Sequence, residues 1–238
     1  MLTLVCATRA SVRDFPQKTL LGPCLPRLGE FMTFGLQLFA ENTRPLGECY
    51  NAAIDAAADG DVLVFLHDDV CVDDWMLGQR LQEALATFDG VGVAGNRRHQ
   101  PGQTTWHLQP LDPASRGKVH DLQAPWDSAH LSGAVWHGPS SPGLSGAMSL
   151  YGPSPAAVVL LDGVLIAARA DRLRASRVRF DPSLGFHFYD LDFCRSAIAA
   201  GLKMGTWPIA ITHASSGGSA HSPAWDHSRQ LYLRKWGA

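Results

Sequence analysis

The feature that most constrains this chain is an apolar run that ends abruptly in acidic residues. Residues 61–66 have the character of a buried strand, and His67, Asp68 and Asp69 follow it directly. Open α/β sheets place their ligand sites at the carboxyl ends of strands, so we expect these side chains at a site. Two adjacent carboxylates repel each other unless a cation or a set of donors offsets their charge.

A helix start is the alternative interpretation of this acidic stretch, because acids suit a helix N-terminus. It accounts for Asp73 and Asp74 better than for Asp68 and Asp69. A metal or ligand role therefore stays the preferred hypothesis for Asp68 and Asp69.

Composition narrows the class of protein. The chain has 238 residues, 46% hydrophobic and 18% charged, which suits one compact α/β domain with a sizeable core. A formal net charge of −2 provides no basic surface for nucleic acid, so no nucleic-acid partner is expected. The cysteines are odd in number and lack CxxC spacing, which predicts neither a disulfide framework nor a zinc site and fits a reducing cytosol.

Two further observations concern localisation. The apolar run at residues 2–7 is too short for a secretory signal and is soon followed by Arg9 and Arg13. No segment approaches 18 uninterrupted apolar residues, so no transmembrane segment is expected. The sequence therefore predicts a cytoplasmic protein, with peripheral attachment to a membrane left open.

Strand and helix patterns alternate along the chain. Strands are expected at 2–7, 35–40, 61–66, 91–94, 156–168 (broken at Asp162-Gly163) and 207–212, and helices at 46–58, 77–88 and 190–200. This βαβ rhythm predicts an α/β fold with a mostly parallel central sheet flanked by helices. No GxSxG elbow, P-loop or HExxH motif occurs, so the local signatures of serine hydrolases, P-loop enzymes and zincins are missing.

Residues 96–155 follow no regular pattern and are rich in Gly, Pro, Ser, His and Trp. We expect an irregular segment there, although a loop of that length is unusual inside a compact domain. Its aromatic residues, among them Trp106, Trp126 and Trp136, suit stacking on a sugar or another flat ligand. Ordinary packing of the segment onto the domain is an equal alternative.

A second acidic cluster opens the helix expected at 190–200. Asp190 and Asp192 are two residues apart, so they point about 200° apart around a helix axis, and only one can face a cleft. Asp190 is the better candidate for a general base, since a partly desolvated carboxylate can have a raised pKa. A simple N-cap role for Asp190 is the alternative.

Taken together, these segments resemble glycosyltransferases of the GT-A fold, specifically the family 2-like group. In those enzymes a strand ends in a DxD-type motif that holds a divalent cation and the nucleotide diphosphate, and His67-Asp68-Asp69 is similar to it. Leu46–Asn51 is similar to the family's helix with an Asn facing the donor, and Asp162-Gly163 to the turn before its acceptor-side strand. Phe180-Asp181-Pro182 is similar to the FDE-like turn, and Tyr189-Asp190 to the Glu-Asp pair that opens a helix. The Arg a turn later, the Gly that ends this helix and the downstream His correspond to Arg195, Gly201 and His213.

The resemblance implies a GT-A-like, Rossmann-type domain over residues 1–238. Residues 1–95 would bind the nucleotide sugar, 96–155 would form an irregular acceptor-side segment, and 156–238 would be the acceptor and catalytic half. The implied reaction transfers a sugar from a UDP-, GDP- or dTDP-linked donor to a hydroxyl of a glycan, a lipid-linked acceptor or a protein, with inversion. It would depend on Mn²⁺ or Mg²⁺.

The resemblance also assigns roles to residues. Asp190 would be the catalytic base, and Asp69 and His213 would hold the metal; imidazole with carboxylate favours Mn²⁺ somewhat over Mg²⁺. A backbone-bonded histidine at a strand end is the alternative for His213. Donor-binding residues would be Thr8, Glu41, Asn42, Asn51 and Asp68, and acceptor-side residues would be Asp162, Gly163, Tyr189 and Trp136.

Two departures from the family pattern keep other functions open. His67 replaces the first acid of DxD, and Tyr189 replaces the Glu of the Glu-Asp pair. The second departure favours a non-catalytic module that binds a sugar nucleotide or glycan. A nucleotidyltransferase that forms sugar nucleotides is a third hypothesis, but residues 7–11 are not the Gly-rich basic loop that such enzymes usually show.

Overall fold

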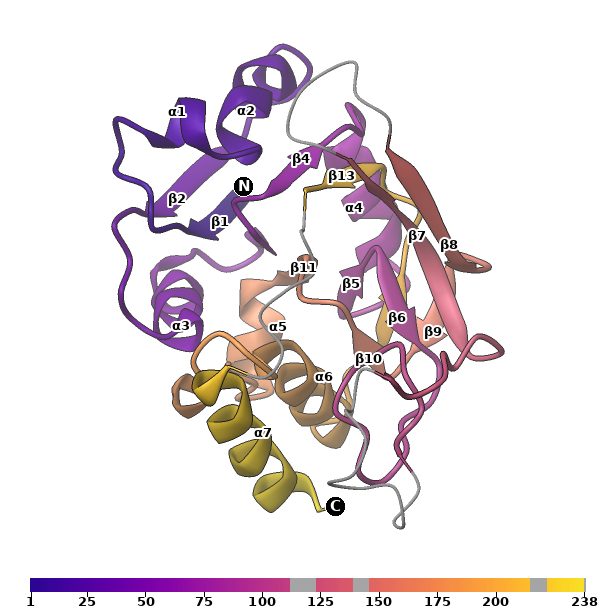
Figure 1. Cartoon of the computed structure of the whole chain (residues 1–238). Coiled ribbons are helices and arrows are strands. Elements are labelled where there is room, and N and C mark those ends of the chain that lie inside the picture. Colours follow the sequence, from indigo (N-terminus) through magenta and orange to yellow (C-terminus); the bar gives the residue numbers. More distant parts are fainter. Residues whose placement is uncertain (112–122, 139–145, 215–221, 238) are drawn as a thin grey trace.

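The computed structural model of the chain describes residues 1–111, 123–138, 146–214 and 222–237 (Figure 1). The strands are β1 Leu2–Ala7, β2 Gly35–Phe39, β3 Val62–Leu66, β4 Val70–Val72, β5 Gly90–Gly92, β6 Ala94–Asn96, β7 Leu131–His137, β8 Ala147–Gly152, β9 Ala156–Val158, β10 Leu160–Leu161, β11 Leu165–Arg169, β12 Met204–Thr206 and β13 Ile211–His213. The helices are α1 Phe15–Lys18, α2 Leu21–Gly29, α3 Leu46–Ala56, α4 Leu77–Leu85, α5 Ala170–Ala175, α6 Tyr189–Ala199 and α7 Pro223–Trp236, with a 3-10 turn η2 at Pro182–Leu184.

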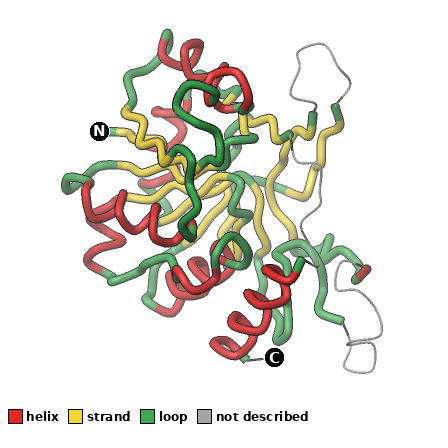
Figure 2. Tube along the Cα trace, turned by 60° about the vertical axis from the view of Figure 1, so that its left-hand side comes forward, coloured by secondary structure: helices red, strands yellow, loops and turns green. Residues whose placement is uncertain are grey.

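The larger sheet has the strand order β2-β1-β3-β11-β5-β12-β9. Strands β2, β1, β3, β5 and β12 run in one direction, whereas β11 and β9 run in the other. The prediction of a mostly parallel α/β sheet is therefore confirmed, with the addition that the sheet is mixed. Figure 2 shows these strands gathered in the middle of the molecule with helices around them.

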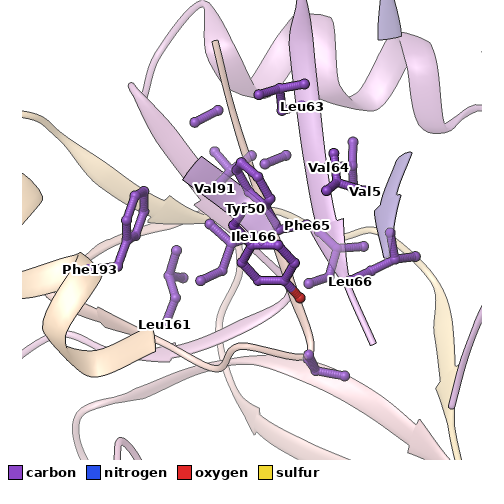
Figure 3. Packing of buried hydrophobic residues seen from close by; sticks show 14 of the residues in the cluster. Val5, Tyr50, Leu63, Val64, Phe65, Leu66, Val91, Leu161, Ile166 and Phe193 are labelled. Atoms are coloured by element: carbon purple, nitrogen blue, oxygen red, sulfur yellow. The ribbon is translucent and has the colours of Figure 1, made fainter. Parts of the chain in front are cut away.

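The core lies on both sides of β3. Its residues 63–66 are buried without alternation, which is the pattern of a strand covered on both faces. Tyr50 of α3 packs against Phe65, with ring centroids 4.9 Å apart (Figure 3). Ile166 of β11 and Val91 of β5 are buried beside them. This packing fixes α3 and three neighbouring strands as one unit beneath the strand ends.

A second sheet has the order β10-β6-β7-β13-β4, with β8 paired to β7. The expectation that residues 96–155 are irregular is wrong for β7 and β8, which form a long antiparallel pair in this range (Figure 1). A glycine within β7, Gly133, interrupts the alternating pattern by which a strand is predicted from sequence. Gly133 has φ +99° beside a register shift, and a Cβ there would clash with the carbonyl of Val93, the residue directly before β6.

Other boundaries also differ from the expectation. The strand expected at 207–212 is replaced by β12 and β13, which belong to different sheets. Residues 15–29, which are punctuated by proline and glycine, form α1 and α2. Pro16 lies in the first turn of α1, where the missing N–H costs nothing, although Pro26 lies inside α2.

Helix α7 is held to α6 by a buried carboxylate. Asp192 is 0% exposed; it accepts a hydrogen bond of 2.7 Å from Trp236 Nε1 and pairs with Lys235 Nζ at 2.8 Å. The guanidinium of Arg195 lies over the Trp236 ring, 4.5 Å from its centroid. Asp192 thus anchors α7 to α6. No described helix is long and apolar enough to cross a membrane.

We expect Asp192→Ala to lower the free energy of unfolding by about 2–3 kcal/mol, because hydrogen bonds to a buried charge are lost and the indole N–H is left unpaired. Urea denaturation measures this loss. Asp14→Ala is a matched control, since Asp14 pairs with Lys18 on the surface, and it should be nearly neutral. Equal midpoints for the two variants would contradict the anchoring role of Asp192.

Candidate active site

The site forms where β3 ends beside the start of β11. The two strands are antiparallel, with Leu66 opposite Leu165, and His67 N donates to Val164 O at 3.4 Å. This pairing brings the turn Asp162-Gly163 next to the acidic end of β3. Residues almost one hundred positions apart thereby share one edge.

A second strand pairing brings His213 to the same edge. β13 runs antiparallel to β4, with His213 opposite Val70, and Ala214 N donates to Asp69 O at 2.9 Å. The backbone therefore fixes His213 beside Asp69. The two elements belong to the smaller sheet, so both sheets contribute to the site.

His67, Asp69 and His213 form a cluster with the composition of a metal site. Asp69 Oδ1 lies 3.4 Å from His213 Nε2 and 3.9 Å from His67 Nδ1, and one ligand atom from each residue lies within 4.8 Å of the others. Asp69 Oδ1 is buried and accepts no hydrogen bond from the described protein. A buried acceptor without a donor is costly, and a cation would satisfy it, so these residues fit a divalent cation.

The two histidines of the cluster differ in charge. Burial lowers the pKa of His67, which keeps its imidazole neutral with a free lone pair. Burial acts to raise the pKa of Asp69, but the contact with His213 outweighs it and lowers the pKa. Burial would lower the pKa of His213, and Asp69 raises it above its usual value. Histidine and carboxylate side chains are both ligands of divalent metal ions.

A pocket of about 820 Å³ lies beside the metal-site residues. Its lining includes four of the five predicted donor-binding residues and two arginines: Thr8, Glu41, Asn42, Asp68, Arg9 and Arg44. The hydroxyl of Thr8 donates to Asp68 Oδ2 and ties the end of β1 to the end of β3. Glu41 has φ +49°, and its N–H donates to Ala10 O, so the turn after β2 folds over the end of β1.

The fifth donor-side residue, Asn51, is not among the lining residues. Its side-chain amide pairs with the backbone of Phe180, donating to the carbonyl at 2.8 Å and accepting from the N–H at 3.0 Å. Trp136 also lies elsewhere, since it lines an apolar pocket of about 950 Å³ together with Met148 and Leu150 of β8. Asn51 and Trp136 therefore do not line the pocket of the other donor-side residues, although the backbone of Trp136 pairs with Thr212, next to His213.

Asp190 lies in a smaller pocket of about 300 Å³, which His67, Asp162, Tyr189 and His107 also line. Its Oδ2 accepts a hydrogen bond from Gly163 N at 3.0 Å. Burial, with the nearby charge of Asp162 as the second cause, raises the pKa of Asp190 to about 7. A carboxylate with that pKa is suited to accept a proton near neutral pH.

The N-cap interpretation of Asp190 is wrong. Helix α6 begins at Tyr189, its cap is Phe188 with φ +63°, and no side chain caps the helix. Asp190 therefore stands in the first turn with its carboxylate turned to the backbone of Gly163. Gly163 belongs to the turn before β11, so the turn and the helix hold Asp190 between them.

Some of the site was missed in the sequence. His67 is one of the three potential ligands, whereas the sequence places it at the site but assigns the metal to Asp69 and His213 alone. Arg9 and Arg44 line the larger pocket, and residues 104–107 line the smaller one. Arg9 is the second residue after β1, so its place near a strand end is an available signal, whereas residues 104–107 carry no comparable pattern.

Comparison with solved structures identifies the architecture. A crystal structure of GalNAc-T7 with UDP, GalNAc and Mn²⁺ is similar over 98% of this chain, with a TM-score of 0.53 and 12% sequence identity. The chain has the GT-A fold. It spans about half of the GalNAc-T7 chain, 48% of its length.

Two weaker similarities accompany this one. A197 from STIV gives a TM-score of 0.43 at 11% identity over 87% of this chain and 81% of that one. The catalytic domain of Drosophila β1,4-galactosyltransferase 7 with xylobiose gives 0.46 at 10% identity over 86% of this chain and 63% of that one. No protein-family model and no curated protein matches the sequence.

We expect Asp69→Ala to abolish Mn²⁺ binding and the Mn²⁺-dependent binding of UDP or GDP, because it removes the central oxygen of the cluster. The fold should persist, since the substitution removes a buried acceptor that has no donor. Calorimetry with Mn²⁺ and each nucleotide measures the affinity, and thermal unfolding checks the fold. Asp171→Ala, at an aspartate paired with Arg169 on the surface, is the control. Unchanged Mn²⁺ affinity in Asp69→Ala would exclude the metal site.

Proposed function

We propose that this GT-A protein is a metal-dependent, inverting glycosyltransferase of the family 2-like group. It would transfer a sugar from a nucleoside-diphosphate sugar to a hydroxyl acceptor. One observation carries the proposal: His67 belongs to the metal-site cluster and also lines the pocket of Asp190, a carboxylate with a pKa of about 7. The residues that would hold a cation for the leaving group and the residue that would act as the base thus lie at one edge of the sheet.

The larger pocket has the chemistry that a nucleoside diphosphate requires. Arg9 and Arg44 supply positive charge, while Thr8, Asn42 and Asp68 supply polar groups. A cation held by His67, Asp69 and His213 would offset the negative charge that develops on the leaving diphosphate. Mn²⁺ in the GalNAc-T7 complex makes that ion a reasonable first choice for assays.

The smaller pocket is the proposed acceptor site. His107 Nδ1 is buried and makes no hydrogen bond within the described protein, so it is available to a ligand hydroxyl. Burial lowers the pKa of His107, which leaves the ring neutral. Trp106 provides apolar surface in the same pocket. Asp190 would take the proton of the acceptor hydroxyl as its oxygen attacks the anomeric carbon.

We expect Asp190→Asn to lower turnover by about 10²–10⁴-fold, because the amide keeps the shape and can still accept from Gly163 N but cannot take a proton. Donor affinity should hardly change, since the proton belongs to the acceptor. Incubation with UDP-, GDP- and dTDP-sugars, Mn²⁺ and an acceptor panel, with detection of the free nucleoside diphosphate, measures turnover.

Asp171→Asn is the matched control and should keep full turnover. Full turnover in Asp190→Asn would refute the base assignment. The anomeric configuration of the product, read by NMR, tests the stereochemistry independently, and retention would refute inversion while leaving transfer itself intact.

The pH dependence offers a separate test. Asp190 must be deprotonated to act, so kcat/KM should fall about tenfold per pH unit below about pH 7. The charge of Asp162 contributes to the raised pKa, so Asp162→Asn should lower the pKa of Asp190 and move this limb to lower pH. The midpoint of the limb is the readout, because it is independent of any loss in rate. An unmoved midpoint would show that Asp162 does not act on the base.

A binding module without turnover is the second candidate. It is favoured by Tyr189, which is 3% exposed and occupies the place where the resembled family has a Glu. Such a module would bind a sugar nucleotide with Mn²⁺ and release no free diphosphate. Binding with no turnover across the donor and acceptor panels would support it.

A further inference from the structure

The two departures from the family pattern, His67 and Tyr189, contact each other. Tyr189 Oη lies 2.7 Å from His67 Nε2 and donates to Gly163 O at 3.0 Å. The Tyr50 and Tyr189 rings meet edge to face, with centroids 5.9 Å apart. All these contacts are inside the protein, because Tyr189 and Tyr50 are buried.

Counting protons assigns the direction of each bond. A phenol has one proton and two lone pairs, and a carbonyl oxygen can only accept. The single proton of Tyr189 is used for Gly163 O, so His67 Nε2 must donate to the phenol oxygen. The neutral His67 ring then carries its proton on Nε2. Its Nδ1 keeps a lone pair that faces Asp69 Oδ1 at 3.9 Å.

We propose that Tyr189 is a positioning residue that fixes His67 as the Nε2–H tautomer, with Nδ1 directed at the cation. Two acceptors facing each other at 3.9 Å need something positive between them, and a divalent cation meets that need. The hydrogen bond to the other ring nitrogen is what sets tautomer and ring orientation in metal-bound histidines. The replacement of Glu by Tyr is thus tied to the replacement of Asp by His.

Gly163 extends the link toward Asp190. Its carbonyl accepts from Tyr189, and its N–H donates to Asp190 Oδ2 at 3.0 Å. A Cβ at this position would clash with the Tyr189 hydroxyl and approach Asp190 Cβ to 3.0 Å, so only glycine allows both bonds. The catalytic consequence of this link rests on the proposed function, whereas the tautomer and the metal affinity do not.

Tyr189→Phe tests the role with the smallest change, because the ring stays in place and only the hydroxyl is lost. Mn²⁺ affinity, measured by calorimetry on the whole chain, should fall about 10–100-fold. Tyr232→Phe is the matched control: it also removes a buried hydroxyl, one that is 3.4 Å from Arg195 Nη1, and it should bind Mn²⁺ like wild type. Equal Mn²⁺ affinity in Tyr189→Phe and wild type would overturn the proposal.

A second measurement needs no activity and begins with the unaltered protein. Long-range ¹H–¹⁵N correlation of the metal-free chain with labelled histidine reports the tautomer of each ring, and His67→Gln identifies the His67 signals. We expect the Nε2–H form of His67 in wild type and in Tyr232→Phe, and a mixture of tautomers in Tyr189→Phe. An Nδ1–H form of His67 in wild type would overturn the proposal, whatever the variants do.

The outcomes separate this inference from the proposed function. The expected tautomer and loss of Mn²⁺ affinity, without release of nucleoside diphosphate from any donor, would sustain the role of Tyr189 and refute the transferase. Turnover in wild type, with unchanged Mn²⁺ affinity and tautomer in Tyr189→Phe, would sustain the transferase and refute the role of Tyr189.

Discussion

The antiparallel insertion of β11 between β3 and β5 is the constraint on which the rest of the site depends. In a purely parallel sheet the start of β11 would lie at the opposite edge from the end of β3. Because β11 is reversed, the turn Asp162-Gly163 instead adjoins His67 at the edge that carries the candidate site. Gly163 in turn bonds both Tyr189 and Asp190, so the reversed strand also fixes the first turn of α6.

Electrostatics explains why such an edge suits both a cation and a mobile proton. Asp69 has a buried oxygen without a donor among the described residues, and its contact with His213 lowers its pKa, so the carboxylate stays charged. Asp190 is also a buried carboxylate, but burial and the charge of Asp162 raise its pKa to about 7, so its protonated form is accessible near neutral pH. Two carboxylates at one edge therefore acquire different chemistry from their surroundings, one suited to a metal and the other to a base.

The scaffold keeps these groups in place through contacts that are not themselves part of the site. The Tyr50 ring packs on Phe65 of β3 and on Phe180, and it meets Tyr189 edge to face. Asp192, which points to the other side of α6 from Asp190, anchors α7. One short helix thus presents one acid to the pocket and another to the packing of α7.

The sequence by itself determined the local parts: buried strand β3 with its acidic end, helix α3, the start of α6, and the choice of Asp190 over Asp192 as the side chain facing a pocket. These follow from hydrophobic period and from the angle between residues on a helix. Tertiary structure alone decided that β11 is reversed, that residues 96–155 contain β7 and β8, and that Asn51 and Trp136 lie outside the two site pockets. Strand pairing depends on contacts between distant residues, which no local pattern encodes, and the same is true of the bond between His67 and Tyr189.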